Sequence, residues 1–221
     1  MIEGVGLADG DGFSDAELTE LRAIGRTRTY ARNARVFHEG ERSDFVVLIV
    51  DGRLKILTAT ADGTEAVLGI RGPGSLVGEL AAFDGGPRTA TAVALDPLTV
   101  RVLPAAQFRE FVASRPGAAL ELIRVLMSRL REGDRRRLEF GAYDATARVA
   151  RLLCDLANER AVTDGHGVDV RLAQHEVAGL VGASRASVAR ALASLRTLDI
   201  VATGRGTITV LDLDALRRIV A

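Results

Sequence analysis

One short run of this 221-residue sequence has the residue types and the spacing to hold a phosphate. It begins with Gly78-Glu79-Leu80, and Arg88 follows ten residues after Gly78, with Thr89 next to it. Glycine lets the backbone approach a ligand closely, and backbone N–H groups at the start of a helical turn attract an anion. Arg88 supplies a guanidinium, and Thr89 a hydroxyl and an N–H group. We expect these residues to cradle one cyclic phosphate, with Glu79 accepting a hydrogen bond from a ribose hydroxyl.

A second run has the pattern of a helix-turn-helix that enters the major groove of DNA. Residues 173–181 predict a first helix, and Gly182 permits the positive φ of a tight turn. Ser184 is a good N-cap for a second helix over residues 185–198. The inward side of both helices carries apolar residues at helical spacing: Val177, Leu180, Val181, Val188, Leu192 and Leu195.

Small and polar residues remain for the outward side of the second helix: Arg185, Ala186, Ser187, Ala189 and Arg190. We expect Arg185 and Arg190 to reach guanine edges or flanking phosphates, because arginine pairs well with both. An ordinary amphipathic helix with two solvated arginines is the alternative. Residues 200–211 then predict a hairpin, the wing of a winged helix, in which Arg205 either touches phosphate or belongs to a plain tight turn.

The segment before the phosphate run must supply a scaffold, and its hydrophobic period is two. Turns that contain glycine, such as Asp51-Gly52, separate six short β-rich runs: residues 35–38, 45–50, 54–57, 66–70, 90–94 and 98–102. A short helix over residues 15–26, capped by Ser14, precedes them. Regularly spaced strands with glycine turns predict a small antiparallel barrel or jelly roll.

Helical periodicity returns over residues 105–143, with a break near Arg115-Pro116-Gly117. An apolar stripe runs through it: Phe108, Phe111, Leu120, Ile123, Met127 and Leu130. From Leu120 onward the stripe is longer than a barrel of this size covers, so we expect the same helix of a second subunit to cover it. Packing on the chain's own barrel is the alternative. Asp144 then caps a new helix over residues 145–160 and marks the domain boundary.

Composition argues against several other classes of protein. Cys154 is the only cysteine, which excludes an intrachain disulfide and multi-cysteine metal sites, and its apolar helix predicts a buried structural thiol. The sequence has no apolar run long enough for a membrane span and no secretory signal pattern, so we expect a cytoplasmic protein. The formal net charge is zero, which neither supports nor excludes DNA binding. No catalytic or metal-ligand constellation is visible, so we expect neither an enzyme nor a bound metal.

Over nearly its whole length the chain resembles the cyclic-AMP receptor protein and FNR family of bacterial regulators. The features that carry the resemblance are the glycine turns at Gly40, Gly52 and Gly78, the Arg88-Thr89 pair, the capped hinge at Asp144 and Val181-Gly182-Ala183-Ser184-Arg185. The resemblance implies that a nucleotide's ribose and cyclic phosphate contact Gly78, Glu79, Arg88 and Thr89.

The sequence departs from the family pattern at two places. The family's adenine contacts come from a Thr-Ser type pair late in the long helix, where this chain has Gly133-Asp134. The family usually carries an acidic residue at the position of Ala186, so we expect a different or looser half-site. Three outcomes are open for the pocket: the base is held differently, the nucleotide is not cyclic AMP, or the pocket is empty. We favour an intact phosphate site with altered base selectivity.

We therefore expect an α+β protein with an N-terminal cyclic-nucleotide-binding β-barrel or jelly roll (residues 1–143), whose last part, 118–143, is a dimerisation helix, and a C-terminal winged helix-turn-helix (144–221). As a homodimer it would bind a pseudo-palindromic DNA operator under control of cyclic AMP or cyclic GMP, with RNA polymerase as a further partner. A constitutive DNA-binding regulator with a degenerate pocket is the alternative. The expected effector residues are Gly78, Glu79, Leu80, Arg88, Thr89 and Asp134, and the expected DNA residues are Ser184, Arg185, Ala186, Ser187, Arg190 and Arg205.

Overall fold

The computed structural model describes residues 7–8, 13–42, 44–59, 65–158 and 167–220. They form two compact units, Ala8–Arg131 and a second made up mainly of Glu132–Ala221. The division falls inside the long helix α4 (Pro116–Ala142), which continues from one unit into the other. The domain boundary that the sequence predicts at Asp144 lies between α4 and α5 (Ala145–Asn158) and stays a prediction.

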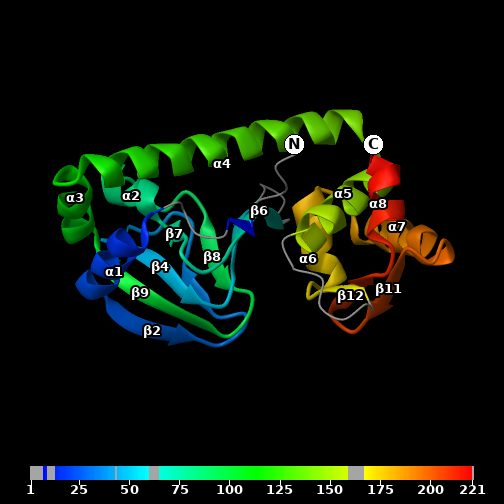
Figure 1. Cartoon of the computed structure of the whole chain (residues 1–221), viewed down its shortest axis with the longest axis horizontal. Helices are drawn as coiled ribbons and strands as arrows, with labels where there is room; N and C mark the ends of the chain where they lie inside the picture. Colours follow the sequence, from blue (N-terminus) through cyan, green and yellow to red (C-terminus); the bar gives the residue numbers. More distant parts are fainter. Residues whose placement is uncertain (1–6, 9–12, 43, 60–64, 159–166, 221) are drawn as a thin grey trace. The chain divides into compact units, whose positions relative to one another are not determined.

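Two antiparallel sheets build the N-terminal unit (Figure 1). Their strand orders are β2-β9-β4-β7 and β1-β6-β5-β8-β3. The strands are β1 (Leu7–Ala8), β2 (Arg26–Tyr30), β3 (Arg35–Phe37), β4 (Phe45–Asp51), β5 (Leu54–Ala59), β6 (Glu65–Arg71), β7 (Leu76–Val77), β8 (Thr91–Ala94) and β9 (Leu98–Pro104). Phe37 and Leu54 of one sheet share a core cluster with Val47 and Val100 of the other. Two sheets around a common core are the jelly-roll arrangement.

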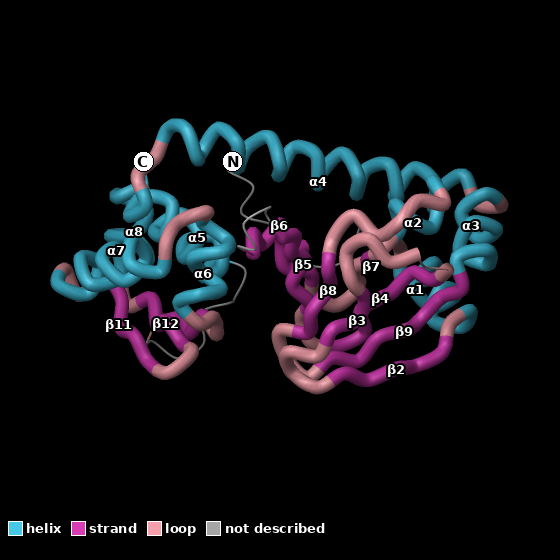
Figure 2. Tube along the Cα trace, turned by 180° about the vertical axis from the view of Figure 1, so that it is seen from behind, coloured by secondary structure: helices cyan, strands magenta, loops and turns pink. Residues whose placement is uncertain are grey.

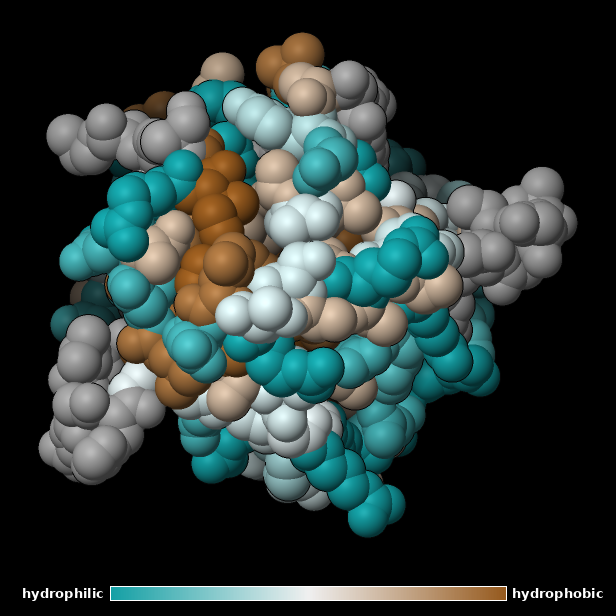
Figure 3. Space-filling view, turned by 90° about the vertical axis from the view of Figure 1, so that its right-hand side faces the viewer, coloured by the Kyte–Doolittle hydropathy of each residue, from teal (hydrophilic) through white to brown (hydrophobic). Residues whose placement is uncertain are grey.

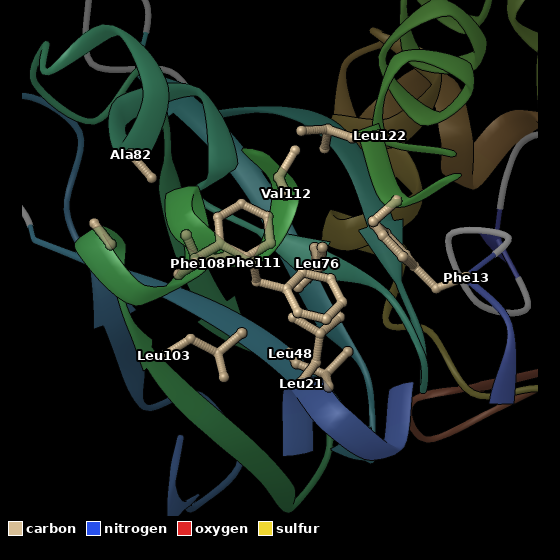
Figure 4. Packing of buried hydrophobic residues seen from close by; sticks show 13 residues of the cluster. Phe13, Leu21, Leu48, Leu76, Ala82, Leu103, Phe108, Phe111, Val112 and Leu122 are labelled. Atoms are coloured by element: carbon tan, nitrogen blue, oxygen red, sulfur yellow. The ribbon is translucent and has the colours of Figure 1, made fainter. Parts of the chain in front are cut away.

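A second core lies on the other face of the four-stranded sheet, under helices. The helices α1 (Asp15–Ile24) and α3 (Ala105–Ala113) and the first turns of α4 contribute to it. Figure 4 shows Phe108 and Phe111 of α3 among Leu48, Leu76 and Leu21, and the side chains of Phe108 and Leu21 are fully buried. Because Ala118 and Leu122 of α4 also belong to this cluster, the first half of α4 is packed on the barrel.

The opposite face of α4 carries exposed apolar side chains. Leu120, Ile123, Met127 and Leu130 are 54%, 51%, 54% and 65% exposed. They are the members of the predicted stripe that the barrel does not cover, whereas Phe108 and Phe111 are buried in it. In this respect the structure differs from the alternative in which the whole stripe packs on its own barrel.

The C-terminal unit packs helices on a small sheet with the order β10-β12-β11 (Figure 2). Its elements are α5, β10 (Val168–Val170), α6 (Gln174–Val181), α7 (Arg185–Thr197), β11 (Val201–Gly204), β12 (Thr207–Val210) and α8 (Leu213–Val220). Val149 of α5, Val177 of α6, Val188 of α7 and Leu216 of α8 are fully buried. Figure 3 shows a narrow hydrophobic strip between hydrophilic residues on the surface of this unit, and Leu198 and Leu211 are among its exposed hydrophobic side chains.

Most of the predicted elements are confirmed, with shifts of a few residues at their ends. The opening helix stops at Ile24 because β2 starts at Arg26 and pairs with β9. Its predicted cap is present: Ser14 Oγ accepts from the Glu17 N–H, and Glu17 accepts from the Ser14 N–H. The strands β1, β2, β7 and β10 and the helix α8 are additional. Asn158 is the last residue described in α5, so its predicted end at Arg160 lies outside the described residues.

Candidate effector pocket and DNA reader

The phosphate run folds as a tight turn into a short helix. Gly78 follows β7 and is the N-cap of α2 (Glu79–Asp84), with φ 87° and ψ 15°. A Cβ at this position would lie 2.1 Å from Nη1 of Arg88, so both the positive φ and the close approach require glycine. On the far side, Arg109 of α3 donates from Nη1 to the Ala82 carbonyl at 2.6 Å and holds the end of α2. The sequence predicted this turn and its short helix correctly.

Arg88 is the most buried basic residue of the described chain, with 2% of its surface exposed. Its Nη1 donates to the Gly78 carbonyl at 2.8 Å and its Nη2 to the Phe45 carbonyl at 2.6 Å. The guanidinium lies 4.1 Å from the ring centroid of Phe37 and 4.7 Å from that of Phe45, within cation–π range. Burial lowers the pKa of Arg88 below its usual range, and the nearby carboxylates, Glu79 first, oppose the shift. Arg88 is therefore a positive charge fixed inside the barrel at the Gly78 turn.

Glu79 is buried beside this turn and connects it to α4. Its Oε1 accepts from Nη1 of Arg129 at 2.5 Å, and Nη2 of Arg129 donates to the Leu76 carbonyl at 2.7 Å. Arg129 was not among the predicted site residues. The helical spacing of the sequence places Arg129 outside the apolar stripe of α4. Only the fold brings it next to Glu79, which lies fifty positions earlier in the chain.

The other expected effector residues occupy different environments. Leu80 is 45% exposed on α2, and Thr89 is exposed next to Arg88. Asp134 is exposed on α4, within the unit that begins at Glu132. The structure thus joins Gly78, Glu79 and Arg88 in one constellation, and ligand binding by these three residues and by Leu80, Thr89 and Asp134 stays a prediction.

The helix-turn-helix has the predicted turn and cap. Gly182, at φ 58° and ψ 45°, ends α6, and its N–H donates to the Ala178 carbonyl. Ser184 caps α7 by accepting from the Ser187 N–H at 3.1 Å. Val188, Leu192 and Leu195 are buried, as their spacing predicts.

The opposite side of α7 is open to solvent. Arg185, Ala186, Ala189 and Arg190 are exposed, and Ser187 is half-buried. Nη2 of Arg190 donates to the Ser187 hydroxyl at 3.1 Å, which joins the second arginine to the capped start of the helix. The predicted wing is present as the β11–β12 hairpin, with Arg205 exposed between its strands. This surface offers arginines and a hydroxyl from the first two turns of one helix, and DNA contact by these residues stays a prediction.

Two arginines, Arg148 and Arg151, lie at the joint between α4 and the helix-turn-helix unit, called the reader below. Asp144 Oδ1 accepts from the Ala147 N–H at 2.8 Å, so Asp144 caps α5 as predicted. Arg148 donates from Nε to the Val181 carbonyl at 2.9 Å, at the end of α6, and from Nη1 to the Tyr143 carbonyl at 2.6 Å. The Arg151 guanidinium lies 4.4 Å from the ring centroid of Tyr143.

The described residues also include the single cysteine and an open cavity. Cys154 is buried, and burial raises the pKa of its thiol to about 11, as a structural thiol requires. In the described part of the chain, no group of histidine, cysteine and acidic residues could hold a metal ion, and no helix combines the length and apolarity of a membrane span. An open cavity of about 620 Å³ lies along β2, between Arg26, Arg28 and Gln107, and reaches Phe45.

Comparison with known families matches both units. Residues 27–115 match the cyclic nucleotide-binding domain, and residues 147–219 match the Crp-like helix-turn-helix domain. The chain is 37% identical over 166 residues to a CRP-like cAMP-activated global transcriptional regulator of Mycobacterium tuberculosis, covering 74% of each protein. It is 29% identical over 208 residues to the cyclic AMP receptor protein of Thermus thermophilus, covering 94% of each.

Solved structures show the same fold. A c-di-GMP responsive global regulator of Xanthomonas campestris superposes with a TM-score of 0.78 at 24% identity, over 90% of this chain and all of that one. A CRP-family transcriptional regulator of Thermus thermophilus superposes with a TM-score of 0.75 at 26% identity, over 87% of this chain and 96% of that one. With both domains matched in order and a relative above 30% identity over three quarters of the sequence, the chain belongs to the CRP/FNR family of DNA-binding transcription regulators, which are not enzymes.

Proposed function

We propose that this chain is an effector-gated transcription regulator whose N-terminal unit binds a cyclic nucleotide. The observation that carries the proposal is Arg88, a buried guanidinium set against the left-handed Gly78 turn and held by two backbone carbonyls and two aromatic rings. The carbonyls are neutral, and Glu79 is paired with Arg129. An entering phosphate would gain a charge-assisted partner where backbone carbonyls now accept.

The same constellation supports a route from the pocket to α4. In the proposal, a ribose hydroxyl donates to Glu79, whose carboxylate is bound to Arg129 of α4. A change in that ion pair would alter the packing of α4. The ligand switches the protein only if it binds the DNA-competent arrangement more tightly than the other.

The exposed stripe on α4 supports a homodimer. Leu120, Ile123, Met127 and Leu130 follow one another at intervals of three and four residues, the spacing of a coiled-coil seam. The same helix of a second copy would bury this stripe. A two-fold dimer places two recognition helices about 34 Å apart on DNA, so the operator would be pseudo-palindromic.

In each subunit, α7 would enter the major groove. Arg185 and Arg190 would read guanine edges or hold phosphates, Ser184 and Ser187 would lie at the capped helix start, and Arg205 of the wing would reach the flanking backbone. Ala186 carries no acceptor, so the base pair opposite it would be weakly specified. We place the protein in the cytoplasm and include RNA polymerase among its partners, because relatives of the chain are named as transcriptional regulators.

The effector is proposed as cyclic AMP or cyclic GMP. Two relatives are named for cyclic AMP, as a cAMP-activated regulator and a cyclic AMP receptor protein. This chain has Gly133-Asp134 on α4, and a carboxylate such as Asp134 accepts hydrogen bonds from ring N–H and amino groups, which guanine presents on one edge.

Two measurements on the full-length protein test the proposal. Calorimetry with cyclic AMP and cyclic GMP should show saturable binding by at least one of them, and fluorescence anisotropy on an operator selected from random duplexes should show tighter binding with that nucleotide present. Equal operator affinity with and without ligand would favour the constitutive regulator.

The dimer is tested separately by sedimentation. Ile123→Asp, in the middle of the stripe, should convert the dimer to monomers, because a carboxylate would be buried in an apolar seam. Arg124→Ala is the matched control, since Arg124 is exposed on α4 outside the stripe. A wild-type monomer at micromolar concentration would contradict this part of the proposal.

A further inference from the structure

Three basic side chains are buried in the described part of the N-terminal unit, and the proposed phosphate site uses one of them. Lys55, Arg71 and Arg88 are 9%, 7% and 2% exposed. Burying a charge is unfavourable unless polar partners compensate, so a buried arginine in a β-barrel calls for a reason. Arg71, the last residue of β6, is the one whose position bears on the ligand.

The strand register places Arg71 on the inner face of the five-stranded sheet. Arg71 pairs with Leu54 of β5, and Gly69 pairs with Ile56. Paired residues on antiparallel strands point to the same side of the sheet. Leu54 belongs to the core cluster between the two sheets and Ile56 packs against it, so Gly69 and Arg71 face that interior. Lys55 pairs with Ile70, which puts it on the opposite face.

The guanidinium of Arg71 lies close against Gly69. A Cβ on Gly69 would lie 2.6 Å from Nη1 and 3.1 Å from both Cζ and Nη2 of Arg71. Nη1 also donates to the Ile70 carbonyl at 2.9 Å. Any side chain at residue 69 would displace the guanidinium, so the Gly-x-Arg sequence keeps this planar donor group against the sheet.

One row of register partners across the five-stranded sheet leads from the position of Arg71 to that of Arg88. Across β6, β5, β8 and β3 the register partners are Gly69, Ile56, Ala92 and Phe37. Three strand spacings of about 4.8 Å separate the ends of this row by about 14 Å. Arg71 lies over one end, and Arg88 lies 4.1 Å from the ring of Phe37 at the other. One interior surface thus has a guanidinium near each end, with apolar side chains between.

A cyclic purine nucleotide has matching features, with its phosphate at one end and the polar edge of its base at the other. With the phosphate at Arg88, the base would extend toward Arg71. Guanine presents two adjacent acceptors, O6 and N7, which match the arginine fork, whereas adenine presents N7 beside an amino donor. In a site shielded from water, a donor that faces another donor strongly disfavours the wrong base.

We propose that Arg71 reads the base of the effector and that the effector carries a guanine ring. The inference rests on the proposed function, because it assumes that Arg88 holds a cyclic phosphate in this barrel. It assigns Arg71 the role of a specificity-determining residue, and Gly69 the role of leaving room for its guanidinium.

Calorimetry on the full-length protein tests the inference with four ligands: cyclic GMP, cyclic IMP, cyclic AMP and the dinucleotide cyclic di-GMP. Cyclic IMP keeps O6 and N7 and lacks the 2-amino group, so it isolates the edge assigned to Arg71. We expect cyclic GMP and cyclic IMP to bind about 5- to 150-fold more tightly than cyclic AMP. If cyclic di-GMP binds better still, the guanine comes from the dinucleotide, which also supports the inference.

Two variants separate base reading from general packing. Arg71→Met should bring the cyclic GMP to cyclic AMP affinity ratio to within about threefold of one, because methionine keeps much of the volume and loses every donor. Lys55→Met, the matched control on the other face of the sheet, should leave the ratio unchanged. If Arg71→Met unfolds the barrel, Arg71→Lys, which keeps the charge and loses the planar fork, should still lower the ratio.

The outcomes separate the inference from the proposed function. Failure of all four ligands to bind the wild-type protein would overturn the proposed effector site and the inference with it. Binding with cyclic AMP preferred, or with a ratio that Arg71→Met and Arg71→Lys leave unchanged, would overturn the assignment of Arg71 alone.

Discussion

The proposed effector pocket and the proposed DNA-binding surface both contain arginine, but they hold it in opposite ways. Arg88 has 2% of its surface exposed and is fixed by two carbonyls and two aromatic rings. Arg185 is exposed at the start of α7. A buried guanidinium must be positioned before the ligand arrives, because the barrel has to compensate its charge at all times. An exposed guanidinium is compensated by water until a phosphate or a base replaces it.

Removal of each arginine should therefore affect a different property of the protein. Loss of the buried one should weaken the fold of its unit and ligand binding together. Loss of the exposed one should weaken DNA binding alone.

Arg88→Ala should give the largest effect on stability. It leaves the Gly78 and Phe45 carbonyls without this donor, and each buried unsatisfied group costs about 1 to 3 kcal/mol. We expect the free energy of unfolding of the N-terminal unit to fall by about 2 to 5 kcal/mol, measured by urea unfolding followed in the near-UV circular dichroism signal. A fall below about 0.5 kcal/mol, the usual range for a surface change, would contradict the structural role given to Arg88.

Arg185→Ala should weaken DNA binding and leave the stability of the fold nearly unchanged. Stability should change by less than about 0.5 kcal/mol, because the side chain is exposed. Discrimination between the operator and random DNA should fall by about 1 to 3 kcal/mol for each half-site, measured by competition gel shift. Arg196→Ala, in the last turn of α7, is the control, and equal losses from both variants would remove the assignment of Arg185.

Ala186→Glu should shift the base preference of the half-site, measured by the same competition gel shift.

The two glycines that flank α2 allow the close packing at Arg88 to be tested separately from backbone strain. Gly78 and Gly85 have φ angles of 87° and 68°, so alanine costs about 1 to 2 kcal/mol of backbone strain at either. Only at Gly78 does the added Cβ meet Arg88, and at Gly85 nothing lies within 4 Å. Gly78→Ala should therefore lower stability by about 1 to 3 kcal/mol more than Gly85→Ala, and should also reduce nucleotide affinity. Equal melting temperatures of the two variants would contradict the close packing at Gly78.

The smallest effect concerns the caps of the two reader helices. Ser184 caps α7 with its side chain, whereas Ala173, the N-cap of α6, makes no side-chain cap bond. Ser184→Ala should lower the stability of the C-terminal unit by about 1 kcal/mol, and Ala173→Ser should raise it by about 0.5 kcal/mol. Calorimetric unfolding measures both, and changes of the same sign would show that capping does not explain the difference.

Sequence periodicity predicted most of this fold, and the exceptions have physical causes. The strands β4, β5, β8 and β9 are short β-rich runs next to turn residues, and both turns of the candidate site depend on a glycine that the sequence displays. The strand β2 reads Arg-Thr-Arg-Thr-Tyr, with exposed residues along most of its length, so no apolar alternation marks it. The strand β7 has only two residues, and tertiary pairing with β4 defines it.

The sequence predicted only the part of the candidate site whose residues lie close together in the chain. Gly78, Glu79 and Arg88 form one local motif, and the structure joins them. Arg129 and Arg71 come from distant segments, and their relation to that motif depends on the packing of α4 and on the register of β6 with β5. A one-residue slip of that register would turn Arg71 outward, and no sequence pattern on β6 alone excludes such a slip.

The cluster at the joint between α4 and α5 has a consequence for how a signal can travel. Arg148 binds the carbonyl of Tyr143, just past α4, and also the carbonyl of Val181, at the end of α6. A rotation at the end of α4 would therefore also be transmitted to α6 through the side chain of Arg148. A lysine in place of Arg148, with a single point of attachment, would not bind both carbonyls in this way, and this side-chain connection between the end of α4 and α6 would be weakened.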